Sequence, residues 1–210
     1  MVAQKNGVSA VGVQRVLGLG SYRTAWVWLH KFRHLMVFPS RNKLSGVIEV
    51  DETLVGGKVA GKRGRGAEGK SLVVIAIERM EKGTGRVRMS LISDASKKSL
   101  MKFINENIEA GNHLITDGWK GYYHEIDDKT KILDGKEILP NVHRIASLLK
   151  RWLLGTRQNY IGEEYLSYYL DEYTFRYNRR KSNSRGLLFQ RLIEQGVLHE
   201  PVEYKSIKSM

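Results

Sequence analysis

The stretch Val47-Ile48-Glu49-Val50-Asp51-Glu52-Thr53 predicts a short strand that ends in a carboxylate. A second stretch, His113-Leu114-Ile115-Thr116-Asp117-Gly118, places another aspartate at the end of an apolar run. Strand ends are rigid, so two adjacent strands can hold two carboxylates close together, as a divalent metal site requires. A lone acid after a strand is more often a turn or capping residue, so the pair needs support from the rest of the chain.

The elements around these aspartates predict a ribonuclease-H-like fold. Three strand-like segments come first and form an antiparallel meander; they are residues 47–55, 72–77 and 87–92. A helix is predicted from its cap at Ser96 to about residue 107, and the strand that ends at Asp117 follows it. A right-handed crossover makes this strand parallel to the first. The predicted class is α/β, a mixed sheet of three antiparallel and then parallel strands, flanked by helices.

Helical patterns occupy both ends of the chain. Residues 8–17 and 21–36, capped by Ser9 and Ser21, form a helix-turn-helix-like pair, and further helices are predicted at 141–154, 162–179 and 186–195. We expect three parts: a small N-terminal helical DNA-binding segment over 1–45, a catalytic domain over 46–182, and a C-terminal helix and tail over 183–210.

Charge points to a polyanionic partner. The 210 residues carry a net charge of +13, and the segment before Glu49 holds seven basic residues and no acid. This asymmetry favours nucleic acid over the alternative, a merely solubilising surface. With no cysteine the chain forms no disulfide, and its longest apolar run is too short to span a bilayer. We expect a cytoplasmic protein with no membrane partner.

Basic residues in several blocks are candidates for DNA contacts. The glycine-basic loop over 61–66 is interpreted as a contact to the DNA backbone, with a solvated hairpin tip as the alternative. It does not fit a phosphate-binding P-loop, because the lysine–hydroxyl ending is missing. The predicted DNA-binding residues are Arg23, Lys31, Lys62, Arg63, Arg65, Arg144, Lys150, Arg151, Arg157, Arg176, Arg179 and Arg180.

A third metal ligand is expected on the helix that begins near residue 141. His143 and Lys150 are seven residues apart, which is two helical turns, so they share one face of this helix. Taken alone, His143 reads more readily as a surface or capping histidine. The rival carboxylates are Glu52, which points to the other side of its strand from Asp51, Glu137, and the pair Glu163 and Glu164 in a helix first turn.

The chain resembles the IS1595-type transposases, whose ISXO2-like transposase domain belongs to the DDE superfamily. Four stretches in order carry the resemblance, which extends over roughly residues 5 to 205. They are Val50-Asp51-Glu52-Thr53-Leu54-Val55-Gly56-Gly57-Lys58, Thr116-Asp117-Gly118-Trp119-Lys120-Gly121-Tyr122, the stretch from Val142 to Thr156, and the stretch from Tyr168 to Arg180.

The resemblance implies an insertion-sequence transposase that cleaves DNA at element ends and transfers strands, as a homo-oligomer on DNA. Asp51 and Asp117 match the two acids of the family pattern, His143 matches its variable third position and Lys150 its trailing basic residue. Two Mg²⁺ or Mn²⁺ ions held by Asp51, Asp117 and His143 would drive in-line phosphoryl transfer. Lys150 would contact a DNA phosphate.

Two departures from the family pattern qualify this picture. The cysteine zinc ribbon with which members usually begin is absent, so we expect the chain to start inside the helical DNA-binding region. An imidazole at position 143 suits Mg²⁺ less well than a carboxylate, which favours Mn²⁺. The alternative functions are a truncated, non-catalytic DNA-binding remnant and a nuclease or junction resolvase with the same fold.

Overall fold

The computed structural model describes residues 7–38, 40–56, 70–119, 122, 131–133, 139–157 and 162–208. The chain divides into two compact units, which we call the sheet unit (residues 42–151) and the helical unit (residues 1–41 and 152–210). The first boundary falls near the expected end of the N-terminal segment at residue 45. The second boundary, after residue 151, differs from the expected end of the catalytic domain at residue 182, because residues 152–182 group with the N-terminal helices.

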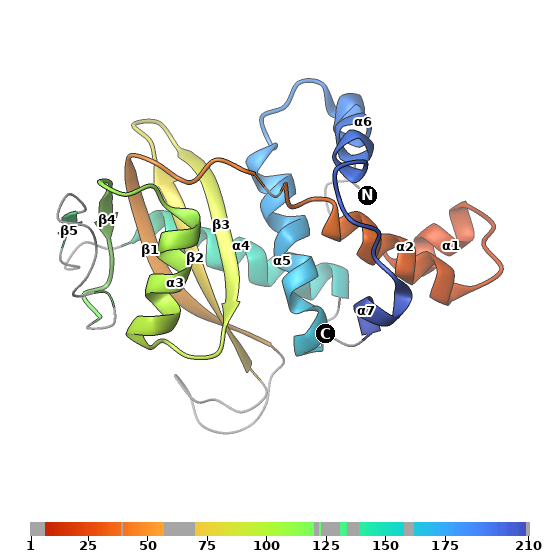
Figure 1. The fold of residues 1–210 in the computed structure, drawn as a ribbon, viewed down its shortest axis with the longest axis horizontal. Helices are drawn as coiled ribbons and strands as arrows, with labels where there is room; N and C mark the ends of the chain where they lie inside the picture. Colours follow the sequence, from red (N-terminus) through yellow and green to blue (C-terminus); the bar gives the residue numbers. More distant parts are fainter. Residues whose placement is uncertain are drawn as a thin grey trace. The chain divides into compact units, whose positions relative to one another are not determined.

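The sheet unit contains one mixed five-stranded sheet in the order β3-β2-β1-β4-β5 (Figure 1). Strands β1 (Val47–Gly56), β2 (Lys70–Arg79) and β3 (Thr84–Ile92) pair antiparallel. The short strands β4 (His113–Ile115) and β5 (Lys131–Leu133) follow in parallel. The predicted ribonuclease-H-like fold is confirmed, with β4 ending two residues before Asp117.

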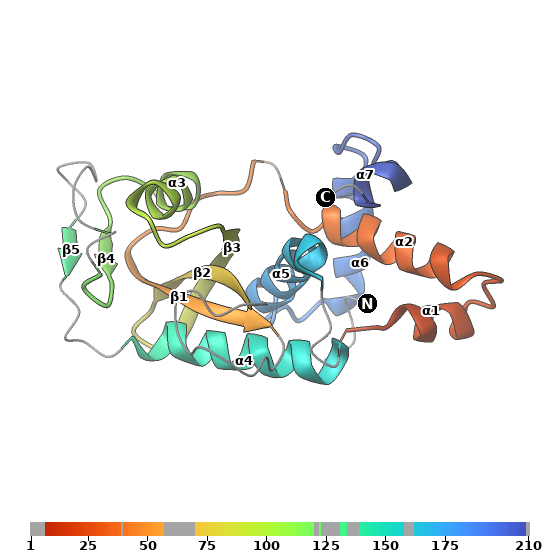
Figure 2. The ribbon, with the colours of Figure 1, turned by 90° about the horizontal axis from the view of Figure 1, so that it is seen from below.

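Two helices cover opposite faces of this sheet (Figure 2). Helix α3 (Lys97–Asn107) is capped by the Ser96 side chain, which accepts a hydrogen bond from the Ser99 amide. Its apolar face joins Ile48 and Val50 in the core. Helix α4 (Pro140–Arg157) covers the other face and buries a stripe at helical spacing, formed by Val142, Ile145, Ala146, Leu149 and Leu153.

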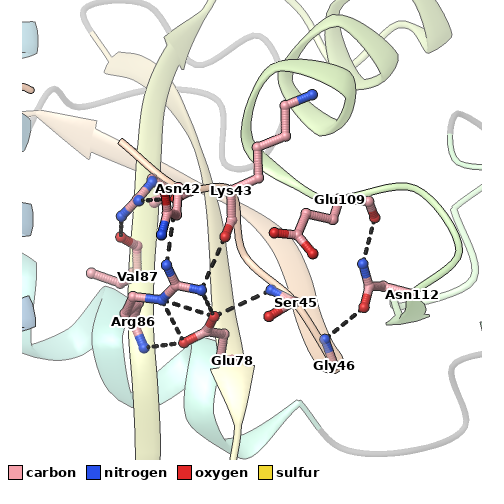
Figure 3. Close-up of polar contacts among 10 residues, drawn as sticks. Asn42, Lys43, Ser45, Gly46, Glu78, Arg86, Val87, Glu109 and Asn112 are labelled. Atoms are coloured by element: carbon pink, nitrogen blue, oxygen red, sulfur yellow. Dashed lines mark hydrogen bonds and ion pairs between the residues drawn. The ribbon is translucent and has the colours of Figure 1, made fainter. Parts of the chain in front are cut away.

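The segment that leads into β1 is held by polar contacts (Figure 3). The Glu78 carboxylate accepts from the Ser45 amide at 3.2 Å, and the Arg86 Nε atom donates to the same carboxylate at 3.0 Å. The Asn112 Oδ1 atom accepts from the Gly46 amide at 2.6 Å. These contacts tie the start of β1 to β2, β3 and the loop before β4, and thereby fix which β1 residues face α4.

The helical unit begins with the predicted pair α1 (Ala10–Val16) and α2 (Tyr22–His34). Ser9 caps α1 through its side chain, and Ser21 lies at the predicted N-cap position of α2, although its side chain makes no capping hydrogen bond. Ala10, Ala25 and Leu29 form a small core between the two helices. Among the described residues, no helix is long and apolar enough to cross a membrane.

The same unit contains α5 (Glu163–Asn178), α6 (Arg185–Gly196) and the short α7 (Tyr204–Lys208). Helix α5 is tied to α2 by a buried ion pair in which Arg33 Nε donates to Glu172 Oε2 at 2.8 Å. Arg176 contacts the other oxygen of Glu172 at 3.3 Å. This network joins residues distant in sequence and accounts for the grouping of α5 with α2.

Candidate active site

Asp51 lies in the middle of β1, and its side chain is 16% exposed. Its Oδ1 atom accepts a hydrogen bond from the Glu52 amide at 2.8 Å. Burial raises the pKa of the Asp51 carboxyl group, and the negative charge of Asp117 raises it further. The Glu52 amide and His143 oppose this rise. The carboxylate is therefore short of compensating positive charge, as expected of a group that holds a cation.

Asp117 reaches the same edge of the sheet because β4 runs parallel to β1. The last paired positions are Glu49 and Ile115, and each aspartate lies two residues beyond its member of that pair. Asp117 is exposed, and its Oδ1 atom accepts from the Trp119 amide at 3.0 Å. The Asp117 carboxylate is close enough to raise the pKa of Asp51 through its negative charge.

His143 comes from α4 and meets Asp51 directly. Its Nε2 atom lies 3.2 Å from the Asp51 Oδ2 atom, and its side chain is 59% exposed. The contact joins two residues that are 92 positions apart in the chain. His143 is therefore an exposed histidine that contacts Asp51, and its role as a metal ligand stays a prediction.

Lys150 follows His143 two turns later on α4 and is exposed. Partial burial lowers the pKa of the Lys150 ammonium group, and the nearby charge of Lys70 lowers it further, while Asp51 raises it. Lys70 is the first residue of β2 and was not predicted from the sequence as part of this region. Two cations and Asp51 therefore share one electrostatic neighbourhood.

Two buried polar residues near Asp51 were not among the predicted site residues. Glu49 is fully buried on β1 and accepts hydrogen bonds from the first turn of α4. The sequence signal for Glu49 was an acid between the apolar residues Ile48 and Val50. Tyr122, also fully buried, donates a short hydrogen bond to Glu52. Burial and the Glu52 charge raise the pKa of the Tyr122 hydroxyl strongly.

The rival carboxylates that the structure describes do not enter the contact between Asp51 and His143. Glu52 bonds Tyr122, which belongs to the core on the α3 side, so the prediction that it faces away from Asp51 is confirmed. Glu163 and Glu164 lie in the first turn of α5, as predicted. Glu137 is outside the described residues.

The described residues contain no group of three or more histidine, aspartate and glutamate side chains that could hold a metal ion as they stand. Asp51 and His143 touch, and Asp117 acts on Asp51 through its charge. The donor chemistry of two carboxylates and one imidazole nevertheless fits a divalent ion. The raised pKa of Asp51 supports that fit, because a bound cation would offset the repulsion between the carboxylates.

The predicted DNA-contacting residues lie in several places. Arg144 and Arg151 are exposed on α4, and Lys31 is exposed on α2. Arg23 places its guanidinium 4.1 Å from the centre of the Tyr204 ring. Arg157 belongs to α4, but its side chain is not described, and the predicted loop residues Lys62, Arg63 and Arg65 lie outside the described part.

Three further predicted DNA-contacting arginines are near the end of α5, and each has an internal partner. Arg176 pairs with Glu172 and is only 14% exposed. Arg179 lies over the Phe175 ring, and Arg180 lies over Tyr177 while donating to the Tyr177 carbonyl. Their packing gives these side chains a structural role, and their contact with DNA stays a prediction.

Comparison with known proteins gives a family match. The model of the ISXO2-like transposase domain matches residues 43–178. No curated protein matches the chain. Among solved structures, the chain is similar to a pre-cleavage Mos1 transpososome, with a TM-score of 0.37 and 10% identity over 96% of this chain and 78% of that chain. A Mos1 transposase paired-end complex with the left transposon end gives a TM-score of 0.37 and 11% identity, over 93% and 76%.

Proposed function

This chain belongs to the ISXO2-like transposase domain family, and from that premise we propose that Asp51, Asp117 and His143 form the metal site with which it cuts and joins DNA strands. The observation that carries the proposal is the 3.2 Å contact between His143 Nε2 and Asp51 Oδ2. In this contact His143, which matches the third position of the family pattern, lies next to Asp51, which matches the first acid. The fold adds Asp117 from the neighbouring parallel strand.

Asp51, Asp117 and His143 would hold two divalent ions, either Mg²⁺ or Mn²⁺. When bound, such ions activate a water or 3′-hydroxyl nucleophile and stabilise the leaving oxygen of an in-line displacement. The protein's own part is to keep Asp51 ionised and oriented. The Glu52 amide does so by donating to its Oδ1 atom, which favours the charged carboxylate against the effect of burial.

Lys150 would contact a DNA phosphate near the bond that is cut. It is exposed on α4, two turns after His143, and lies within the electrostatic range of Asp51. The exposed Arg144 and Arg151 on the same helix would bind flanking phosphates. The remaining predicted DNA contacts, on α2, in the 61–66 loop and at the end of α5, would bind further phosphates. The net charge of +13 supports DNA as the partner.

The test is a metal-dependent cleavage and strand-transfer assay on duplexes that carry the ends of the element that encodes the chain. We expect Asp51→Asn to abolish both reactions while salt-sensitive DNA binding stays nearly intact, because the change removes one charge and keeps the shape. Asp94→Asn is the matched control. Asp94 is an exposed acid before α3, and an asparagine Oδ1 can accept the same hydrogen bonds from Ser96 and Ser99.

Three outcomes would contradict the proposal. Wild-type protein that binds the ends without cutting them, at any divalent ion concentration, would leave a DNA-binding protein of this fold. Faster cleavage of an RNA–DNA hybrid than of duplex DNA would instead identify a ribonuclease-like activity. Joint loss of binding and cleavage in Asp51→Asn would show that the residue acts on folding or DNA contact.

A further inference from the structure

Glu49 is an acid with no exposed surface in the interior of β1. Its Oε2 atom accepts from the Asn141 amide at 2.9 Å and from the Val142 amide at 3.1 Å, and its Oε1 atom accepts from the Asn141 Nδ2 atom at 2.6 Å. A buried carboxylate is costly unless such donors surround it. All three donors belong to the first turn of α4.

These contacts complete the hydrogen bonding of that turn. The first amides of a helix have no partner within the helix. Pro140 has no N–H group, the amides of Asn141 and Val142 donate to Glu49, and the His143 amide donates to the Leu139 carbonyl at 3.1 Å. The negative charge of Glu49 also faces the positive end of the helix dipole. Glu49 therefore anchors the start of α4 to β1.

The anchor lies beside the candidate active site. Residues 49 and 51 are two apart on a strand and point to the same face of the sheet. On the helix, His143 follows Val142 directly, and it is His143 that reaches Asp51. One pair of strand residues thus meets one pair of adjacent helix residues: Glu49 holds Val142, and Asp51 contacts His143.

We infer that Glu49 is a positioning residue that sets the place of His143 relative to Asp51. The inference rests on the proposed function for its effect on the reaction. The apolar stripe of α4 holds the helix against the sheet, but apolar contacts are non-directional and leave sliding and rotation open. The three hydrogen bonds to Glu49 are directional and remove that freedom at the end of the helix where His143 lies.

The test compares Glu49→Gln with Glu109→Gln, an exposed acid after α3, as the matched control. The glutamine keeps the size of the side chain but puts a donor where an acceptor is needed. We expect single-turnover cleavage of the element ends at saturating protein to slow by about ten- to hundredfold, with the Kd for DNA within about twofold of wild type. The control variant should behave as wild type does.

A second measurement reports on position without any reaction. In metal-free protein without DNA, the NMR signals of the His143 ring should shift in Glu49→Gln and stay in place in the control. In the background of His143→Ala, Glu49→Gln should slow cleavage by less than about twofold further, because two residues that act through one contact are not additive. A merely structural role would instead add its full effect in both backgrounds.

Asn141→Ala covers the case in which Glu49→Gln fails to fold. It removes one of the three hydrogen bonds and leaves both amide donors in place. A smaller loss in the same direction, with a shifted His143 signal, is expected. Unchanged His143 signals and unchanged cleavage in these variants would overturn the inference. Failure of the wild type to cut DNA would instead contradict the proposed function, and the His143 signals would still test the anchor.

Discussion

The Nε2 atom of His143 lies 3.2 Å from the Oδ2 atom of Asp51 and joins helix α4 to the central strand of the sheet. This contact predicts a metal preference. Mg²⁺ favours oxygen ligands, and Mn²⁺ accepts an imidazole nitrogen more readily. We expect faster cleavage with Mn²⁺ than with Mg²⁺, and a shift toward Mg²⁺ in His143→Glu. Equal initial rates with both ions in the wild type would remove the inference, and chelation by EDTA supplies the zero-activity control.

Lys150 predicts a measurable change in salt dependence. If it neutralises one phosphate, Lys150→Gln should weaken binding uniformly across DNA sequences and reduce the slope of log K against log salt by about 1. Fluorescence anisotropy titrations at several salt concentrations measure that slope. Lys102→Gln, an exposed lysine on α3, is the matched control and should leave the slope unchanged. An unchanged slope in Lys150→Gln would place the residue away from the DNA.

Asp171 predicts a pH-dependent stability. Burial raises the pKa of its carboxyl group to about 7, although the positive charge of Arg41 opposes the rise. The folded state therefore keeps a proton that the unfolded state has already lost at pH 5. The stabilisation is complete below the unfolded pKa and is lost as pH rises through the folded pKa.

Urea unfolding at pH 5 and pH 8 tests this prediction. From pH 5 to pH 8 the wild type should lose about 2 kcal/mol more unfolding free energy than Asp171→Asn, which has no proton to release. Other groups titrate alike in both proteins, so the difference isolates position 171. Parallel pH profiles for the two proteins would show that the carboxyl group ionises freely in the folded chain.

The ion pair between Arg33 and Glu172 predicts a large cost for removing one partner. Both side chains are buried, with exposed fractions of 1% and 0%. Glu172→Ala should lower the unfolding free energy by about 3–5 kcal/mol, because it leaves a buried guanidinium without a counter-charge. Joint replacement of Arg33 and Glu172 by leucine should lower the unfolding free energy by less than the two single leucine replacements do in sum.

Chemical denaturation measures these free energies. Glu194→Gln is the control, because Glu194 is exposed on α6 and should change stability by no more than about 0.5 kcal/mol. Additive costs for Arg33 and Glu172 would mean that the two charges do not stabilise each other.

Much of the sheet unit could be predicted because its elements have strong local patterns. Strand β1 and helices α3 and α4 appear near their predicted bounds, and the right-handed crossover rule correctly makes β4 parallel to β1. Short elements carry too few residues for a periodic pattern, so α7 was missed and β5 had no predicted bounds. Their formation depends on neighbours that are distant in sequence.

The partners of buried charges could not be predicted. The sequence shows Arg33 and Glu172 as two ordinary helical residues 139 positions apart, and only the fold makes them an ion pair. The role of Glu49 was missed for the same reason. Alternation indicates that it shares a face with Asp51, but the donors of α4 that make its burial tolerable come from another part of the chain.

The alternation of β1 also constrains how this domain can change over evolutionary time. Gain or loss of one residue between Gly46, whose amide is held by Asn112, and Glu49 would turn Glu49 and Asp51 toward α3 and turn apolar side chains toward α4. Evolution can therefore change residue types in this part of β1 but not the number of residues in it.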